Sequence, residues 1–593
     1  MPMRGGELIA EYLIGEKVPY VFGLCGHGIV GLMVALGQRA DRIRMIGVHH
    51  EQVAGYMADA YYRVSHRPAA TFTSCGPGSV NIAIALACAM MDSSALVAIT
   101  GNVPTPQWNR GPFQETYRHH QADFPSVIRP YVKRAFQVPR AEMLPLALRQ
   151  AFKIAATGRP GPVNVDVPLD VFVEETTAAV PDPADWWHAI DRRPGPSPEA
   201  ARRALELLMG AERPVILVGN GAVLSDAAPE IRRLAEALGA PVANTPQGAG
   251  VVPADHPLAV GVVGRNGTYA ANQATRQADV LLALGARFDD RVSSGWVPGY
   301  TFTIPPTRLI HVDIDPDEIG RNYPVHLGVT ADVRSFVRAL LALAESGNGR
   351  GAHAPWLREV AGWQRDWVQF NERRDRADAV PIQPEHLIRT LRRAVPRDGV
   401  VLADVGVHHN WMVQQWPVYE PRTLLQSWGF AAMGFAVGGV LGAKLAAPER
   451  AAVAVCGDGG FLMTSNAVAT AVEYGIPATW IVWNNAGYVS IRDLQKGAFG
   501  KETTTMFSRV STGEPFSPDY AMLARACGAD GIRVTAPGEL GDALGAAVRS
   551  GRPTVVDVAV DVAPPIATGT WQLPPLPHPE PNYPALLARP DAG

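Results

Sequence analysis

Residues 456–489 read CGDGGFLMTSNAVATAVEYGIPATWIVWNNAGYV, with a glycine-flanked aspartate near the start and two consecutive asparagines near the end. The residue types predict a strand over 452–456, a helix over 461–474 and an apolar strand over 478–483. Taken singly, the GDG and NN pieces are also compatible with ordinary tight turns. Because neighbouring parallel strands end at the same sheet edge, however, we expect Asp458 and Asn485 to lie side by side.

This pairing favours a magnesium and diphosphate site. Mg²⁺ prefers octahedral oxygen coordination and commonly combines few protein ligands with phosphate oxygens and water. Asp458 and Asn485 would supply side-chain oxygens, and Gly487 a backbone carbonyl oxygen. Glycines let backbone N–H groups approach a diphosphate at the start of a helix. The glycines in question are Gly457, Gly459 and Gly460.

The 593-residue chain has the composition of a globular enzyme, with 47% hydrophobic and 18% charged residues. β-Branched runs alternate with Ala/Leu/Arg-rich helical stretches, which predicts α/β architecture with parallel sheets. Proline-rich residues 178–200 and glycine-rich residues 344–355 separate three blocks, each the size of a doubly wound domain. The blocks are 1–180, 195–345 and 370–565, followed by a proline-rich tail at 566–593 that we expect to form an extended surface arm.

Charge and cysteine content narrow the function class. The net charge of −3 and the pI near 6.6 argue against nucleic acid as a partner. The N-terminus predicts an amphipathic helix and not a signal peptide, and no apolar run is long enough to span a bilayer. Five scattered cysteines without CxxC pairing argue against zinc and for reduced thiols. We therefore predict a cytoplasmic enzyme with a small-molecule substrate and no membrane partner.

These motifs resemble those of thiamine diphosphate (ThDP) enzymes, and over nearly the whole chain those of the acetolactate synthase (acetohydroxyacid synthase) group. LADVGVHHNWM resembles that group's DVGQHQMWA, and FAAMGFAVGGVLGA its GAMGFGLPAAIGA. Counterparts of HHEQVAGYMADAY, SCGPGSVN, FQET and GRPGPVNVDVPLDV are found in the first block. The resemblance implies ThDP and Mg²⁺ as cofactors. It also implies three doubly wound parallel-sheet domains, in the order pyrimidine-binding, central and diphosphate-binding.

Glu51 matches the family's activating glutamate. The resemblance implies that its carboxyl group hydrogen-bonds the aminopyrimidine ring and thereby promotes loss of the thiazolium C2 proton. A positioned acid or base of this kind contributes about 10²–10⁴-fold to a rate. Without the resemblance, a carboxylate that stabilises a helix N-terminus would be the preferred interpretation of Glu51.

The same resemblance assigns further positions to the cofactor. Met433 matches the apolar residue that wedges ThDP into a bent shape, although alone it would be a core methionine. Gly406 and His408 match positions near the diphosphate, and Val407 replaces the family's glutamine there. The remaining ThDP positions, both in SCGPGSVN, are Pro77 and Asn81.

A flavin is the third cofactor that the resemblance suggests. Arg159 in GRPGPV, Arg287 in GARFDDR and Asp313 in HVDIDPDEIG match segments that contact FAD in synthases. Other members of the superfamily use the middle domain for ADP or for no ligand. Ordinary turns at strand ends are the alternative interpretation of these three segments.

The segments that lie near the substrate in relatives differ in sequence from those of the synthases. VFGLCGHGI has Cys25 and His27 where synthases show VFGYPGGA, and the histidine resembles that of cyclic 1,2-dione hydrolases. Gln114, in FQET, lies near the substrate in relatives. The following segment, TYRHHQADFPSVI, is longer than in synthases and introduces His119 and His120. Each of these side chains is also compatible with a surface or capping role.

A second departure follows Asn485, where Ser490, Arg492 and Leu494 replace the synthases' residues. The added polar groups favour a substrate larger or more polar than pyruvate. Four functions remain open: decarboxylation of a 2-keto acid with carboligation, hydrolysis of a cyclic 1,2-diketone, a 2-hydroxyacyl-CoA lyase or decarboxylase, and a non-catalytic scaffold. The resemblance favours the first. Glu51 and Asp458 lie in different domains, which in relatives meet across a subunit interface, so the resemblance also implies a homodimer or homotetramer with active sites between subunits.

Overall fold

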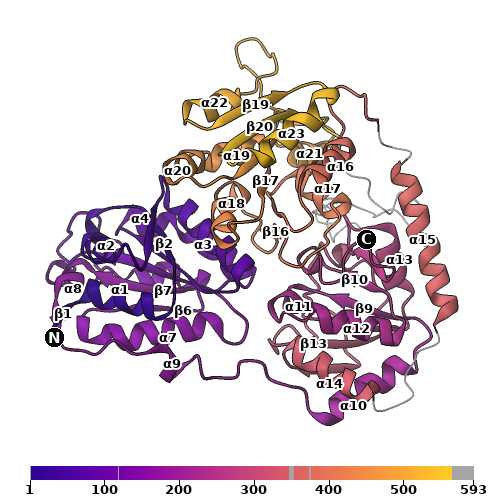
Figure 1. Cartoon of the computed structure of the whole chain (residues 1–593), viewed down its shortest axis with the longest axis horizontal. Coiled ribbons are helices and arrows are strands. Elements are labelled where there is room, and N and C mark those ends of the chain that lie inside the picture. Colours follow the sequence, from indigo (N-terminus) through magenta and orange to yellow (C-terminus); the bar gives the residue numbers. More distant parts are fainter. Residues whose placement is uncertain (1, 118, 346–352, 373–375, 564–593) are drawn as a thin grey trace, which may run out of the picture.

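The computed structural model describes residues 2–117, 119–345, 353–372 and 376–563. Three six-stranded sheets, all of parallel strands, follow one another along the chain, and Figure 1 shows them as three separate lobes. A short antiparallel pair, β1 (Met3–Arg4) and β8 (Glu175–Thr176), joins the two ends of the first lobe. The predicted fold class, α/β with three doubly wound parallel sheets, is confirmed.

The first lobe has the strand order β3-β2-β4-β5-β7-β6. Its strands are β2 (Tyr20–Gly23), β3 (Arg44–Gly47), β4 (Ala69–Thr73), β5 (Leu96–Asn102), β6 (Arg134–Gln137) and β7 (Val163–Pro168). One face of the sheet is covered by α1 (Gly5–Gly15), α2 (Val30–Gly37) and α7 (Leu144–Ala156). The other face is covered by α3 (Glu51–Ser65) and α5 (Ala83–Met91).

The middle lobe has the order β11-β10-β9-β12-β13-β14, which is the strand order of dinucleotide-binding domains. The strands are β9 (Pro214–Val218), β10 (Val242–Asn244), β11 (Ala259–Val262), β12 (Val280–Leu284), β13 (Arg308–Asp313) and β14 (Leu327–Thr330). The helices α10 (Pro198–Met209), α12 (Ala228–Leu238) and α14 (Val333–Glu345) cover one face. The opposite face packs on α13 (Tyr269–Gln277) and α15 (Ala354–Glu372).

The third lobe repeats the topology of the first, with the order β16-β15-β17-β18-β20-β19. Its strands are β15 (Val400–Ala403), β16 (Leu424–Gln426), β17 (Ala452–Gly457), β18 (Thr479–Asn484), β19 (Asp530–Val534) and β20 (Thr554–Ala559). One face packs on α16 (Pro384–Ala394), α17 (Val407–Gln415) and α23 (Leu540–Arg549). The other packs on α18 (Phe435–Ala446), α20 (Ala467–Tyr474) and α22 (Tyr520–Ala526).

Strand order decides where ligands can bind. In doubly wound sheets the crevice lies beyond the carboxyl ends of the two strands between which the winding direction reverses. These strand pairs are β2 and β4, β9 and β12, and β15 and β17. SCGPG and DVG directly follow strands of these pairs, GDG begins at the last residue of β17, and GHG begins three residues after β2 ends. The topology therefore predicts one crevice in each lobe, lined by the motifs that the sequence singles out.

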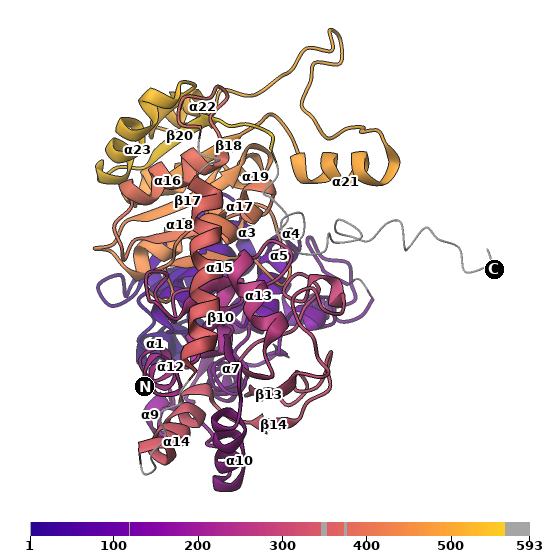
Figure 2. The ribbon, with the colours of Figure 1, turned by 90° about the vertical axis from the view of Figure 1, so that its right-hand side faces the viewer.

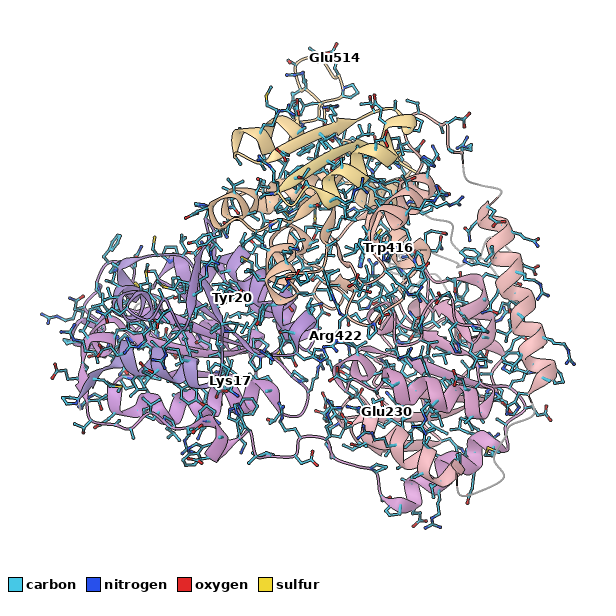
Figure 3. The ribbon with its side chains drawn as sticks, viewed as in Figure 1. Lys17, Tyr20, Glu230, Trp416, Arg422 and Glu514 are labelled. Carbon is cyan, nitrogen blue, oxygen red and sulfur yellow. The ribbon has the colours of Figure 1, made fainter. Side chains whose placement is uncertain are left out.

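The first and third lobes share one hydrophobic core, in which α3 packs along α18. Glycines on α18 make this close approach possible, because a Cβ on Gly442 would lie 1.9 Å from the carbonyl oxygen of Met57. Arg422 lies where all three lobes meet (Figure 3). Its guanidinium donates to the carbonyl oxygen of Val64 in the first lobe and pairs with Asp226 of the middle lobe.

One predicted helix differs in the structure, and one predicted segment lies outside the described residues. The helix predicted over 461–474 is interrupted, and α19 (Asp458–Thr464) and α20 are joined through Ser465 and Asn466. Both residues keep right-handed helical dihedral angles, and the backbone N–H of Val468 donates to the carbonyl oxygen of Ser465 at 3.0 Å, so the chain makes one tighter turn at this point. The proline-rich tail at 566–593 lies outside the described residues. No helix in the described ranges is long and apolar enough to cross a membrane.

Candidate active site

The first half of the candidate site lies at the carboxyl ends of β17 and β18. Gly457 pairs with Trp483 across these parallel strands, so Asp458 and Asn485 follow neighbouring strand ends. The Asp458 Oδ2 atom accepts the backbone N–H groups of Asn485 and Gly487, each at 3.1 Å. Burial raises the pKa of this carboxyl group to about 6, although its backbone hydrogen bonds act in the opposite direction. The expected adjacency of Asp458 and Asn485 is present.

Glycines form a cradle beside this carboxylate. The His408 ring fills the space next to two of them, because a Cβ on Gly406 or Gly457 would lie 2.6 or 2.9 Å from its Cε1 atom. Burial lowers the pKa of His408 to about 3, so the ring is neutral at physiological pH. Its Nε2 atom and the Nδ2 atom of Asn485 are buried and have no partner among the described residues.

These two orphaned atoms fit a polar ligand, because buried polar groups normally have hydrogen-bond partners. The remaining glycines of the motif are also held closely. A Cβ on Gly459 would lie 2.3 Å from the Tyr488 ring, and one on Gly460 would lie 2.3 Å from Asp404. The neutral histidine, the amide and the glycine-lined start of α19 together suit a diphosphate with a bound cation.

Asp404 is a supporting residue that the sequence analysis missed. It is fully buried at the end of β15, and its carboxylate accepts the backbone N–H groups of Gly434 at 2.9 Å and Ala436 at 3.2 Å. These hydrogen bonds hold the start of α18. Met433 directly precedes this turn, so Asp404 fixes its position. The position of this aspartate at the end of a predicted strand, in LADVG, could have indicated its role.

Asn484 is the second supporting residue, although it adjoins a predicted ligand. Its amide donates to Asp557 at 2.8 Å, and its oxygen accepts from Ser517 at 3.0 Å and from the backbone N–H of Ala486 at 3.3 Å. These bonds fix the turn that carries Asn485. Asp557 and Ser517 were missed because neither lies in a recognisable motif.

The second half of the candidate site lies in the first lobe. Glu51 is the first residue of α3 and is only 6% exposed. Its Oε2 atom accepts a 3.0 Å hydrogen bond from Asn81, at the end of α4 (Pro77–Asn81). A Cβ on Gly78 would lie 3.2 Å from Oε1, so α4 packs directly over the carboxyl group. The structure therefore brings Glu51, Asn81 and the helix that begins at Pro77 together.

Next to Glu51 lies a group of predicted substrate-side residues. His27, at the end of the turn after β2, is exposed, and its Nε2 atom lies 3.7 Å from the sulfur of Cys75. The thiol also lies 3.6 Å from Oε1 of Gln114. His119 and His120 lie on the exposed surface of the loop beyond Gln114, where His120 stacks on Tyr117. The structure thus places His27 and Gln114 around Cys75, a residue that the sequence analysis passed over.

Within one chain, the segment that leads into Glu51 packs on the third lobe away from Asp458. The segment from the end of β3 to the start of α3 contacts the third lobe through Tyr474, whose hydroxyl accepts the N–H of Gly47 at 2.8 Å, and through a 3.3 Å pair between His49 and Glu473. These partners lie at the end of α20. Asp458, by contrast, opens α19, at the opposite end of this pair of helices.

The middle lobe carries a cavity of about 440 Å³ beyond β9 and β12. Arg159, Arg287 and Asp313 all line it, so the three predicted flavin residues lie together although they come from two lobes. Arg159 donates to Glu318 at 3.1 Å, and Arg287 to the carbonyl oxygen of Met91 at 2.8 Å. Burial raises the pKa of Asp313 to about 6.

Comparison with known proteins agrees with this geometry. Residues 3–123 match the N-terminal TPP binding domain of thiamine pyrophosphate enzymes, residues 201–340 their central domain, and residues 404–558 their C-terminal TPP binding domain. The chain belongs to the thiamine pyrophosphate (that is, ThDP) enzyme family. The predicted resemblance to this family is confirmed.

Individual relatives indicate which kind of ThDP enzyme the chain resembles. A probable acetolactate synthase large subunit of Methanocaldococcus jannaschii is 34% identical over 95% of this chain and 92% of its own. The acetolactate synthase isozyme 3 large subunit of Escherichia coli K12 is 33% identical over 94% of this chain and 95% of its own. The acetolactate synthase large subunit of Corynebacterium glutamicum is 34% identical over 94% of this chain and 87% of its own. The protein is a ThDP-dependent, acetolactate synthase-like enzyme that forms C–C bonds.

Proposed function

We propose that the protein decarboxylates a 2-keto acid and joins the resulting acyl unit to a second carbonyl compound, with ThDP and Mg²⁺ as cofactors. The observation that carries the proposal is the buried Asp458 carboxylate, bonded to the turn of Asn485 and Gly487 and next to the glycine cradle of His408. When bound, the thiazolium ring of ThDP stores the electron pair released by breaking a C–C bond next to a carbonyl group.

We assign each group of residues to one part of the cofactor. Asp458, Asn485 and the Gly487 carbonyl would hold Mg²⁺, while His408 and the glycines at 406, 457, 459 and 460 would hold the diphosphate. Met433, fixed through Asp404, would support the ring system. Glu51 would exchange a proton with a pyrimidine nitrogen, and Asn81 would orient its carboxyl group. We assign residues 1–180, 195–345 and 370–565 to the pyrimidine-binding, central and diphosphate-binding domains.

A second copy of the chain would complete the site, because the segment before Glu51 packs at the end of α20, away from Asp458 at the start of α19. Apolar side chains around both half-sites support a homodimer as the basic unit, two of which would form a homotetramer. Near Glu51, Val80 and Ile84 are each 45% exposed, and on α19 Leu462 and Met463 are 41% and 51% exposed. Such a patch would be covered on association. The free and mostly buried cysteines support a reducing, cytoplasmic location.

We further propose that the middle-lobe cavity binds FAD. The dinucleotide-type strand order and the convergence of Arg159 and Arg287 on the cavity support this assignment. An ADP moiety alone is the alternative. A flavin absorption spectrum of the protein purified without added cofactor distinguishes the two.

The substrate experiment separates the two leading reactions. With ThDP and Mg²⁺, the protein is expected to convert pyruvate into acetolactate and CO₂, and a chelator is expected to abolish the activity, because Asp458 and Asn485 need the cation to bind diphosphate. Acetolactate is measured after its conversion to acetoin, with protein lacking added ThDP as the control.

The His27, Cys75 and Gln114 group favours ring hydrolysis of a cyclic 1,2-diketone as the second candidate. Turnover of cyclohexane-1,2-dione without any product from pyruvate would contradict the carboligase proposal.

A further inference from the structure

Cys75 occupies the crevice of the first lobe, at the end of β4 and beside the turn that follows β2. The two strand ends are pressed together, because a Cβ on Gly28 would lie 2.7 Å from the Cys75 sulfur. The backbone N–H of Gly28 also donates to Ser74 at 3.2 Å. Ser74 lies 3.3 Å from the Cβ position of Gly78, which packs on Glu51. The thiol is therefore fixed at the edge of the sheet where the catalytic glutamate is expected to act.

The Cys75 side chain is 1% exposed, and besides the hydroxyl of its neighbour Ser74, which donates to the sulfur at 4.0 Å, it touches two polar atoms. The His27 Nε2 atom lies 3.7 Å away, and the Gln114 Oε1 atom lies 3.6 Å away. Both distances are in the range of sulfur hydrogen bonds, which are longer than those of oxygen. Burial raises the pKa of the thiol, so it keeps its proton at neutral pH and acts as a donor.

Gln114 is held in an unusual backbone conformation. Its φ angle is +65°, in the left-handed region that non-glycine residues adopt rarely, often at functional sites. A Cβ on Gly76 would lie 2.8 Å from Gln114 Cβ, so the absence of a side chain at Gly76 lets this loop approach Cys75. Among the described residues, none accepts a hydrogen bond from the Gln114 Nε2 atom, whose two N–H groups are free to bind a ligand.

We propose that Cys75 is a positioning residue, whose thiol joins His27 and Gln114 in one directed row of hydrogen bonds. The S–H group donates to Oε1 of Gln114, and the sulfur accepts from the Nε2–H group of His27. Two consequences follow from the chemistry of these groups. The imidazole is held as the Nε2–H tautomer, with Nδ1 available as an acceptor. The Gln114 amide is oriented with its N–H groups outward, where they bind a carbonyl or carboxylate oxygen of the 2-keto acid. This second consequence rests on the proposed function.

The tautomer of the His27 imidazole can be measured without any substrate and tests the proposed row of hydrogen bonds. In ¹⁵N-histidine-labelled protein at a pH where His27 is neutral, the His27 signals, identified by their loss in His27→Gln, are expected to show the Nε2–H form. In Cys75→Ala they are expected to shift toward a mixture of tautomers, whereas Cys88→Ala, which removes another buried thiol, leaves them unchanged. An Nδ1–H form, or signals that Cys75→Ala does not alter, would overturn the proposal.

Steady-state kinetics test the consequence for substrate binding. Cys75→Ala is expected to raise KM for pyruvate by about 3- to 10-fold with little change in kcat, because a hydrogen bond made equally in ground and transition states is weakened. In a Gln114→Ala background the same substitution should have almost no further effect, since Cys75 acts through Gln114. An equal rise in both backgrounds would identify a merely structural role and overturn the proposal. If the wild-type protein does not turn over pyruvate, the proposed function fails, and the tautomer experiment alone decides the role of Cys75.

Discussion

Glu51→Gln is expected to slow the exchange of the C2 proton of bound ThDP by about 10²–10⁴-fold, and to lower kcat to a similar extent. The substitution keeps the size of the side chain and an acceptor for Asn81, whose amide lies 3.0 Å from Oε2. It removes only the ability to exchange a proton with the cofactor. The exchange rate is measured by hydrogen–deuterium exchange with acid quenching and NMR.

Glu199→Gln is the matched control, because Glu199 also lies in the first turn of a helix but is exposed in the middle lobe. This variant should exchange the C2 proton at the wild-type rate. Thermal unfolding of Glu51→Gln should stay close to that of the wild type, since the buried hydrogen bond to Asn81 is retained. Wild-type exchange in Glu51→Gln would remove this residue from the mechanism.

Asp458→Ala is expected to weaken Mg²⁺-dependent ThDP binding by about 100-fold or more, because a hydrogen-bonded charge is worth up to about 3 kcal/mol. The carboxylate has two tasks. It faces the predicted cation site, and its Oδ2 atom accepts the N–H groups of Asn485 and Gly487. Its removal therefore also releases the turn that carries the other two proposed ligands. Affinity is measured by isothermal titration of ThDP at saturating Mg²⁺.

Two further variants separate these tasks. Asp458→Asn can still accept hydrogen bonds from the turn but lacks the charge, so it should lose affinity for ThDP while unfolding at nearly the wild-type temperature. Asp542→Asn, at an exposed aspartate in the first turn of α23, should retain wild-type affinity. Tight Mg²⁺-dependent binding of ThDP by Asp458→Ala would show that the cation site lies elsewhere.

The helix α21 (Val489–Phe499) projects from the third lobe (Figure 2) and concerns the choice of substrate. This helix carries Ser490, Arg492 and Leu494, the positions at which the sequence departs from the synthases. Arg492 pairs with Asp493 at 2.6 Å and donates to the carbonyl oxygen of Val562. In a single subunit it therefore contacts its own chain and not the crevice of the first lobe. Its part in substrate selection stays a prediction.

Local sequence determined the lobes and the strand ends, and the resemblance of motifs along nearly the whole chain gave the class of cofactor. Apolar periodicity and glycine position are properties of short segments, so β17 and β18 were predicted to within one residue at each end, and the GDG and NN motifs were placed correctly at their carboxyl ends. The one error in this stretch is the uninterrupted helix over 461–474, which the structure divides at Ser465 and Asn466.

Tertiary structure alone decided which distant residues support these motifs. Asp404 reaches the start of α18, Asp557 holds Asn484, and Cys75 lies between His27 and Gln114. Each contact joins segments that are brought together by strand order, and strand order depends on how whole sheets pack and not on the residues of any one segment. The same reason explains why only the folded chain shows the segment before Glu51 packed at the end of α20, away from Asp458, which is the observation that supports the proposed site between two subunits.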